Sequence, residues 1–119
     1  MSLFLRTLLI LTLPVMLCAA ELHAPPWEKP GAVIRLGESL YRENCAVCHD
    51  IDKDQKSTRK IGPSLNHLFK KPRLPLSKGR PSRDYVKVRI QYGGQVMPAF
   101  MKRINEEQIA ALLVYLESK

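Results

Sequence analysis

Cysteine is scarce in this chain of 119 residues, which has only Cys18, Cys45 and Cys48. A structural zinc site is usually built from two closely spaced ligand pairs. No second C-x-x-C pair and no H-x-x-x-H pair follows Cys45 and Cys48, and His67 is the only further ligand near them in the sequence. The sequence therefore gives a zinc site little support, although zinc and a plain disulfide stay open as alternatives.

Long apolar runs are also scarce, and the clearest one lies within the first twenty residues. Arg6 precedes an apolar run from Leu8 to Leu17, and the small residues Ala19 and Ala20 follow it. A basic start, an apolar centre and small residues at the end are typical of a secretory signal peptide. We predict a signal peptide over residues 1–20, cleaved after Ala20, and export to the periplasm. A retained N-terminal anchor facing the periplasm is the alternative.

Cleavage at Ala20 would also remove Cys18 and leave only the pair Cys45 and Cys48. The mature chain would be one small domain, near the size at which an apolar core alone is marginally stable. Hydrophobic residues make up 45% of the sequence, which argues against disorder. We expect a proline-rich leader over residues 21–31, a folded domain over residues 32–119, and no span of the membrane by the mature form.

Acidic residues are few, 11 against 19 Lys and Arg. The imbalance is concentrated between Lys53 and Arg89, where Asp54 and Asp84 are the only acidic residues. The positive electrostatic field of so many Lys and Arg residues favours a partner protein with an acidic docking surface or anionic lipid head groups. A solvated surface with no specific partner is the alternative, and the predicted export argues against nucleic acid.

Residues 45–49 read Cys45-Ala46-Val47-Cys48-His49, which is the spacing of a covalent haem attachment site. The two thiols form thioethers with the haem, and the histidine ligates its iron. A dithiol redox site would want a strand before Cys45, whereas the preceding residues indicate a helix. The sequence predicts one haem c with its iron, held by Cys45, Cys48 and His49.

Three segments are predicted to be helices, residues 32–45, 82–92 and 104–117. In the first, Leu36 and Leu40 lie on the expected apolar face, and Gly37 interrupts the pattern, which indicates close approach by another backbone. Residues 86–92 alternate like a strand, but Ser82 and Gly93 suit the two caps of a helix. The last segment has a capping-box pattern at its start. A further short helix is expected over residues 66–69.

These features resemble the class I cytochromes c, which are small electron carriers with a single haem. Gly37 and Tyr41 are similar to the glycine and aromatic residue with which the first helix of that family packs against the last helix. The segment from Gly62 to Leu65 resembles the family's G-P-x-L motif. The resemblance implies that the Pro63 carbonyl accepts a hydrogen bond from His49, which orients the ring.

Met97 comes directly before a proline in a loop, as the distal ligand does in that family. The resemblance therefore implies that Met97 ligates the iron opposite His49, with Met101 and His67 as rival ligands. No tryptophan follows Trp27, although some relatives place one beside a haem propionate. The propionate partners thus stay open among arginine, lysine and tyrosine residues.

The resemblance implies an all-α cytochrome c fold, with roughly three to five helices around one haem. The function implied is outer-sphere electron transfer by iron with His49 and Met97 as ligands, without catalytic residues. The resemblance also implies redox partner proteins, and the chain is expected to be a monomer or a subunit of a complex. One alternative is a haem c subunit of a periplasmic oxidoreductase complex. The other is a ligand-binding or peroxidatic haem protein in which Met97 is labile.

Overall fold

The computed structural model describes residues 30–75 and 77–119 of the chain. Their helices are α2 (Pro30–Asn44), the short 3-10 helix η3 (Leu68–Lys70), α3 (Arg83–Tyr92) and α4 (Glu106–Glu117). These residues contain no strand, and the predicted all-α class is confirmed. The predicted signal peptide and all but the last two residues of the predicted leader lie outside the described part.

Helix α2 begins two residues earlier than predicted, at Pro30. Proline is suited to the first turn of a helix, because its fixed φ is helical and its missing N–H has no partner there in any case. The last two residues of the expected extended leader are therefore helical. Across the described residues, no helix combines the length and the hydrophobicity needed to cross a membrane.

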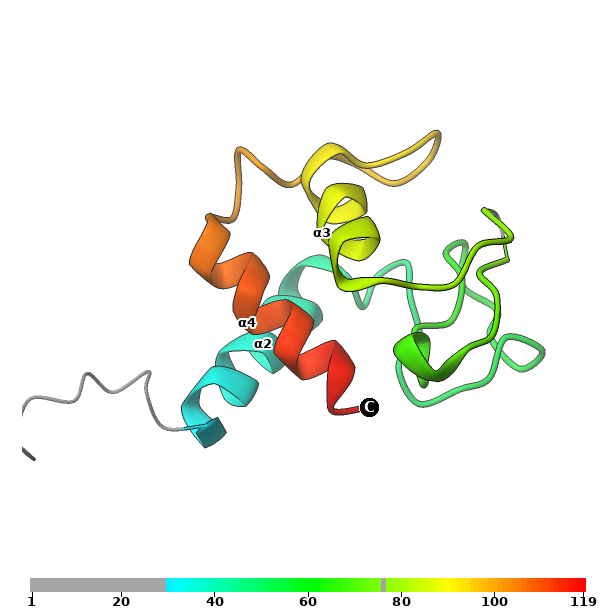
Figure 1. Ribbon diagram of the computed structural model, residues 1–119, viewed down its shortest axis with the longest axis horizontal. Coiled ribbons are helices and arrows are strands. Elements are labelled where there is room, and N and C mark those ends of the chain that lie inside the picture. Colours follow the sequence, from blue (N-terminus) through cyan, green and yellow to red (C-terminus); the bar gives the residue numbers. More distant parts are fainter. Residues whose placement is uncertain (1–29, 76) are drawn as a thin grey trace, which may run out of the picture.

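Helix α2 crosses α4 in close contact, and the two helices form the centre of the fold (Figure 1). The contact is closest at Gly37, where an added Cβ would lie 2.6 Å from Cβ of Tyr115 and would collide with the carbonyl oxygen of Ala111. The rings of Tyr41 and Tyr115 pack beside it with centroids 5.7 Å apart. The predicted close approach at Gly37, and the predicted meeting of the first and last helices, are confirmed.

The buried face of α2 differs from the predicted one, which contained Leu36 and Leu40. Leu40 and Tyr41 are buried, whereas Leu36 is 41% exposed. Because successive residues of a helix are rotated by about 100°, the face that places Gly37 against α4 turns Leu36 away. The assignment of Leu36 to the buried face was wrong for this reason.

Helix α3 settles the conflict between the strand and helix patterns. Val86 and Ile90, which are four residues apart, are buried, whereas Val88 and Tyr92 are exposed. The hydroxyl of Ser82 accepts a hydrogen bond from the amide of Tyr85 at 3.1 Å and caps the helix. Gly93 ends it with a φ of 70°, in a region that favours glycine. The prediction of a helix with these caps is confirmed.

Helix α4 begins at Glu106, two residues after the predicted start, and Asn105 is its N-cap within the predicted capping-box pattern. The Asn105 side chain accepts from the amide of Gln108 at 2.8 Å, and the Gln108 side chain accepts from the amide of Asn105 at 2.9 Å. The buried residues of α4 supply much of the core: Ile109, Ala111, Leu112, Leu113, Tyr115 and Leu116. Ion pairs from Lys87 to Glu106 and from Arg83 to Glu117 hold α3 against this helix.

The chain between α2 and α3 runs mostly without regular structure, as the green part of Figure 1 shows. The short helix expected over residues 66–69 is the 3-10 helix Leu68–Lys70. It starts later because His67 adopts a left-handed conformation, with φ 49°, which a helix cannot include. This long connection matters for function because its first part packs against the end of α2.

Candidate functional site

The segment Cys45–His49 continues α2 by one turn. The amides of Cys48 and His49 both donate to the carbonyl oxygen of Cys45, at 3.0 and 2.9 Å, and the amide of Cys45 donates to that of Tyr41 at 2.8 Å. Val47, between the two cysteines, is 79% exposed. The turn therefore directs Val47 to solvent and keeps both thiols half-buried at its base.

Cys45 and Cys48 do not form a disulfide with each other. Burial raises the pKa of Cys45 to about 11, and the nearby Cys48 adds to the increase. Reactive dithiol sites lower the pKa of their cysteine and so favour the thiolate. The environment of Cys45 does the opposite, which argues against the dithiol alternative. Among residues 30–75 and 77–119, no three His, Cys, Asp or Glu side chains are grouped in a way that could hold a metal ion by themselves.

His49 is buried, with 8% of its surface exposed. Its Nδ1 lies 2.7 Å from the carbonyl oxygen of Pro63. Because a carbonyl can only accept, Nδ1 is the donor and the neutral ring keeps a lone pair on Nε2. The hydrogen bond that the resemblance implied is therefore present, and it leaves Nε2 able to ligate a metal.

Gly62 lies directly against the ring of His49. An added Cβ at Gly62 would stand 2.5 Å from Cε1 and 2.6 Å from Nδ1 of the imidazole. The amide of Gly62 also donates to the carbonyl oxygen of Cys48 at 2.8 Å. The structure thus brings Gly62 and Pro63 together with Cys48 and His49, across a long stretch of sequence.

Further contacts, which no sequence pattern indicated, hold the same turn. The hydroxyl of Tyr41 donates to the carbonyl oxygen of His49 at 2.8 Å, and its burial raises the pKa of Tyr41 to about 12. Lys60 and Asp50 meet at 3.3 Å beside it. A hydrogen bond from Thr58, and then the Lys60 ammonium, lower the pKa of the Asp50 carboxyl. Tyr41 was expected only to pack between helices, and nothing in the spacing singled out Lys60.

Met97 lies on a separate loop, between α3 and α4. It is partly buried and packs against the core. The amide of Gly94 donates to its carbonyl oxygen at 2.8 Å, and the amide of Phe100 donates to Ile90 at 3.0 Å, so both ends of the loop are fixed near the end of α3. Gly93 allows this close return, because an added Cβ would lie 2.7 Å from the carbonyl carbon of Pro98.

The rival ligands have different surroundings. Met101 is 52% exposed. Nδ1 of His67 lies 2.5 Å from the main-chain oxygen of Lys119, and this contact ties the His67 ring to the last residue after α4. Of the three side chains, Met97 is the one that packs against the core.

The donor set fits a covalently attached haem. Two half-buried thiols lie on one helical turn, next to an imidazole whose Nε2 is free to ligate iron. Because Gly62 has no Cβ, the imidazole of His49 can lie directly against its backbone. The thioether of Met97 lies on a loop whose ends are hydrogen-bonded near the end of α3, and a thioether is a soft neutral group of the kind that ligates haem iron opposite histidine in cytochromes.

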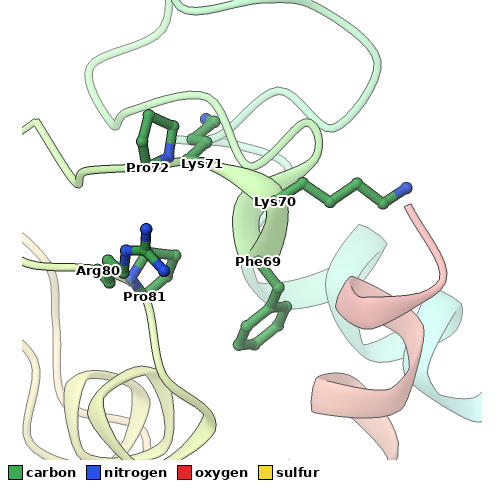
Figure 2. A pocket seen from close by; sticks show the side chains of 6 residues that line it. All are labelled: Phe69, Lys70, Lys71, Pro72, Arg80 and Pro81. Carbon is green, nitrogen blue, oxygen red and sulfur yellow. The ribbon is translucent and has the colours of Figure 1, made fainter.

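A basic pocket is formed by η3 and the connection from it to α3. It has a volume of about 280 Å³ and is lined by Phe69, Lys70, Lys71, Pro72, Arg80 and Pro81. Figure 2 shows Lys71 and Pro72 on one side of it, with Arg80 and Pro81 facing them. Nζ of Lys71 donates to the main-chain oxygen of Ser64 at 2.5 Å, and burial lowers the pKa of this lysine. The lining of this concave surface thus includes three basic residues, although Nζ of Lys70 points away from it and donates to the main-chain oxygen of Lys119 at 3.2 Å.

A small helical domain whose first and last helices cross, with a C-x-x-C-H turn after the first helix, defines a c-type cytochrome domain. Comparison with known families gives the same class. Residues 32–116 match the family described as "Cytochrome C oxidase, cbb3-type, subunit III", and the chain belongs to this family. This membership implies a covalently bound haem c and a part in haem-based electron transfer.

A curated relative supports the same class over a shorter stretch. The chain is 38% identical over 42 residues to a protein named "Cytochrome c" from Sesamum indicum. The alignment covers 35% of this chain and 36% of that protein, so the chain spans about a third of the relative's length. No solved structure matches the chain.

Proposed function

We propose that this chain is a mono-haem electron-transfer protein in which His49 and Met97 ligate the iron. Cys45 and Cys48 hold the haem through thioethers. The observation that carries the proposal is the hydrogen bond of 2.7 Å between Nδ1 of His49 and the carbonyl oxygen of Pro63. It fixes one tautomer of a buried imidazole and makes Nε2 the ligand atom.

A bound haem supplies a one-electron couple of its iron. The residues around it set how that couple behaves. Gly62 and Pro63 orient His49, so that the ligand keeps its place in both oxidation states. Met97 offers a soft, neutral sulfur, which favours the ferrous state more than a second histidine would. Pro98 stiffens the loop that carries it.

The distal ligand can be identified from optical spectra of the purified protein in Met97→Ala and Met101→Ala variants. We expect the weak sulfur-to-iron band to disappear in Met97→Ala and to persist in Met101→Ala, because Met101 is exposed. Loss of the band in Met101→Ala alone would reverse the assignment. A wild-type spectrum without this band, changed by His67→Ala, would indicate a bis-histidine site. Protein without a covalent haem spectrum would end the proposal.

If His49 and Met97 both hold the iron, a substrate would have to displace one of them to reach it. We therefore propose an outer-sphere electron carrier without catalytic residues of its own. Carbon monoxide should leave the ferrous spectrum unchanged at neutral pH. A spectral change would instead favour the ligand-binding or peroxidatic alternative, in which Met97 is labile.

Residues 1–20 are proposed to be a signal peptide, followed by a leader up to residue 31 and a cytochrome c domain over residues 32–119. The basic Arg6, the apolar run after it and the small residues before Glu21 support this division. Mass spectrometry of the mature protein from the periplasm should find Glu21 at its start. Recovery of the uncleaved chain in the membrane fraction would support the anchored alternative.

We propose that the redox partner docks through an acidic surface, and that nucleic acid is not a partner. Support comes from the basic pocket, whose lining includes Lys71 and Arg80 (Figure 2). An electrostatic encounter of this kind is slowed by salt, because screening shortens the reach of the charges. The rate of electron transfer to an acidic acceptor should fall with ionic strength. An unchanged rate would contradict acidic docking.

A second candidate function is a haem c subunit of an oxidoreductase complex. The family description favours it, because it names a subunit of a cbb3-type oxidase. Purification of the tagged chain at low and high salt distinguishes the candidates. Recovery with the same membrane or periplasmic enzyme at both salt concentrations would support a subunit. A monomer that reduces several acceptors would support a free carrier.

A further inference from the structure

One lysine binds the segment that carries His49 at three points. Nζ of Lys60 donates to the main-chain oxygens of Ala46 and His49, at 3.1 Å for the latter, and lies 3.3 Å from Oδ1 of Asp50. An ammonium group has three N–H donors and no acceptor. These three oxygens therefore account for the full donor capacity of Lys60.

The position of this cation suits the helical turn. Carbonyl groups at the end of a helix lack partners within it and carry partial negative charge. Ala46 and His49 belong to the last turn after α2, and both of their carbonyl oxygens accept from Lys60. The ammonium thus caps the turn from which the imidazole of His49 projects.

The Asp50 carboxylate is mostly covered by protein, whereas Lys60 is partly open to solvent. The Lys60 side chain is 34% exposed and that of Asp50 is 13% exposed. The other carboxylate oxygen of Asp50 accepts from the hydroxyl of Thr58 at 2.6 Å. Because the Asp50 carboxylate is mostly covered, water screens its charge less than that of a fully exposed carboxylate.

The segment that contains Lys60 continues directly to the partners of His49. The amide of Gly62 donates to Cys48 at 2.8 Å, the amide of Leu65 donates to Asp50 at 2.7 Å, and the Pro63 oxygen accepts from His49. Lys60 is therefore the first residue of a segment, residues 60–65, that is hydrogen-bonded along the turn that carries His49. If the contacts of Lys60 were lost, this segment would be held less firmly and the imidazole of His49 would be oriented less well.

We propose that Lys60 is a positioning residue for His49, and that its charge, balanced by Asp50, tunes the reduction potential of the iron that His49 ligates. This inference rests on the proposed function. Reduction removes one positive charge from the metal, and a nearby cation makes the ferrous state more favourable. Without Lys60, the Asp50 carboxylate would be left uncompensated beside the ligand and would favour the ferric state.

Redox titrations of the haem-loaded protein test the charge effect in Lys60→Met, Lys56→Met and the double variant Lys60→Met with Asp50→Asn. Lys56 is the matched control, because it is exposed on the same connection and has no hydrogen bond or ion pair to residues 30–75 or 77–119. We expect Lys60→Met to lower the ferrous-to-ferric ratio at a fixed potential several-fold, Lys56→Met to change it much less, and the double variant to recover most of the loss. Equal potentials in Lys60→Met and Lys56→Met would overturn the inference.

Amide hydrogen exchange tests the positioning effect without reference to the iron. The amides of Gly62 and Leu65 should exchange faster in Lys60→Arg than in the wild type, because a planar guanidinium cannot serve three acceptors around one nitrogen. The potential of this variant should stay near that of the wild type, since the charge is kept. If Lys60→Met does not retain haem, the test rests on Lys60→Arg. Unchanged hydrogen exchange at the amides of Gly62 and Leu65 in Lys60→Arg would overturn the positioning role of Lys60. A wild-type protein without covalent haem would instead end the proposed function.

Discussion

Gly37 of α2 lies so close to Ala111 of α4 that no side chain fits between them. The contact lets the two helices cross with their backbones nearly touching, and the rings of Tyr41 and Tyr115 close one side of it. Tyr41 in turn donates to the carbonyl oxygen of His49. The helix crossing and the haem-attachment turn are therefore parts of one packed unit.

Gly37→Ala should destabilise the protein by about 1–3 kcal/mol, because the added methyl group forces the helices apart. The free energy of unfolding, measured with urea, gives the change directly. Gly31→Ala is the control, since it makes the same substitution in α2 where the new Cβ meets only the end of the Arg35 side chain, at 3.3 Å. A loss of stability equal to that of the control would contradict the close crossing.

Gly62→Ala should disturb the ligand more than the fold. The new Cβ would displace the imidazole of His49 and weaken its hydrogen bond to Pro63. We expect a changed haem spectrum and a lower affinity of His49 for the iron, with the helical circular dichroism retained. Gly79→Ala is the matched loop variant, because its Cβ meets only the Ser77 hydroxyl at 3.8 Å. If both variants keep the wild-type spectrum, Gly62 is not required for the orientation of His49.

Asn105→Ala should cost about 1 kcal/mol of stability, the usual effect of losing an N-cap. The substitution removes the acceptor for the amide of Gln108 at the start of α4. Urea denaturation of the variant measures the loss, and Asn105→Ser should recover most of it because serine caps a helix nearly as well. A stability of Asn105→Ala equal to that of the wild type would mean that solvent replaces the cap at no cost.

Acid should destabilise the protein partly through Glu106. Hydrogen bonds from Lys87, and to a smaller extent from Gln91, lower the pKa of this carboxyl below its ordinary value. The folded state thus binds the proton less tightly than the unfolded state. The stabilisation is present above the ordinary pKa of glutamate, about 4.3, and is lost as the pH falls through the lower folded pKa.

Urea denaturation between about pH 2 and pH 6 measures this contribution. The free energy of unfolding of Glu106→Gln should fall less steeply with acid than that of the wild type. Glu107→Gln is the control, because it removes the neighbouring exposed carboxylate. Identical pH profiles for the two variants would show that the contacts of Glu106 across α3 and α4 do not stabilise the fold.

The sequence predicted the three main helices because the signals for them are local. Ser82 and Gly93 outweighed the alternation of residues 86–92, since a cap forms with amides only a few residues away. The resemblance to cytochromes c supplied the bond between His49 and Pro63. Without it, Gly62 and Pro63 would have indicated only a turn.

Other features depended on the path of the chain. Leu36 was assigned to the wrong face because periodicity does not say which residue faces the partner helix, and the contact at Gly37 turned it outward. His67 took a left-handed conformation next to the last residue of the chain, which no local pattern indicated.

The sequence by itself determined the attachment turn, the helices and their caps, because these rest on hydrogen bonds between residues a few positions apart. Only the tertiary structure decided that Lys60, among the many basic residues of the connection, reaches the oxygens of Ala46, His49 and Asp50. That choice follows from how an irregular segment returns across the end of α2, and such a return leaves no periodic mark in the sequence.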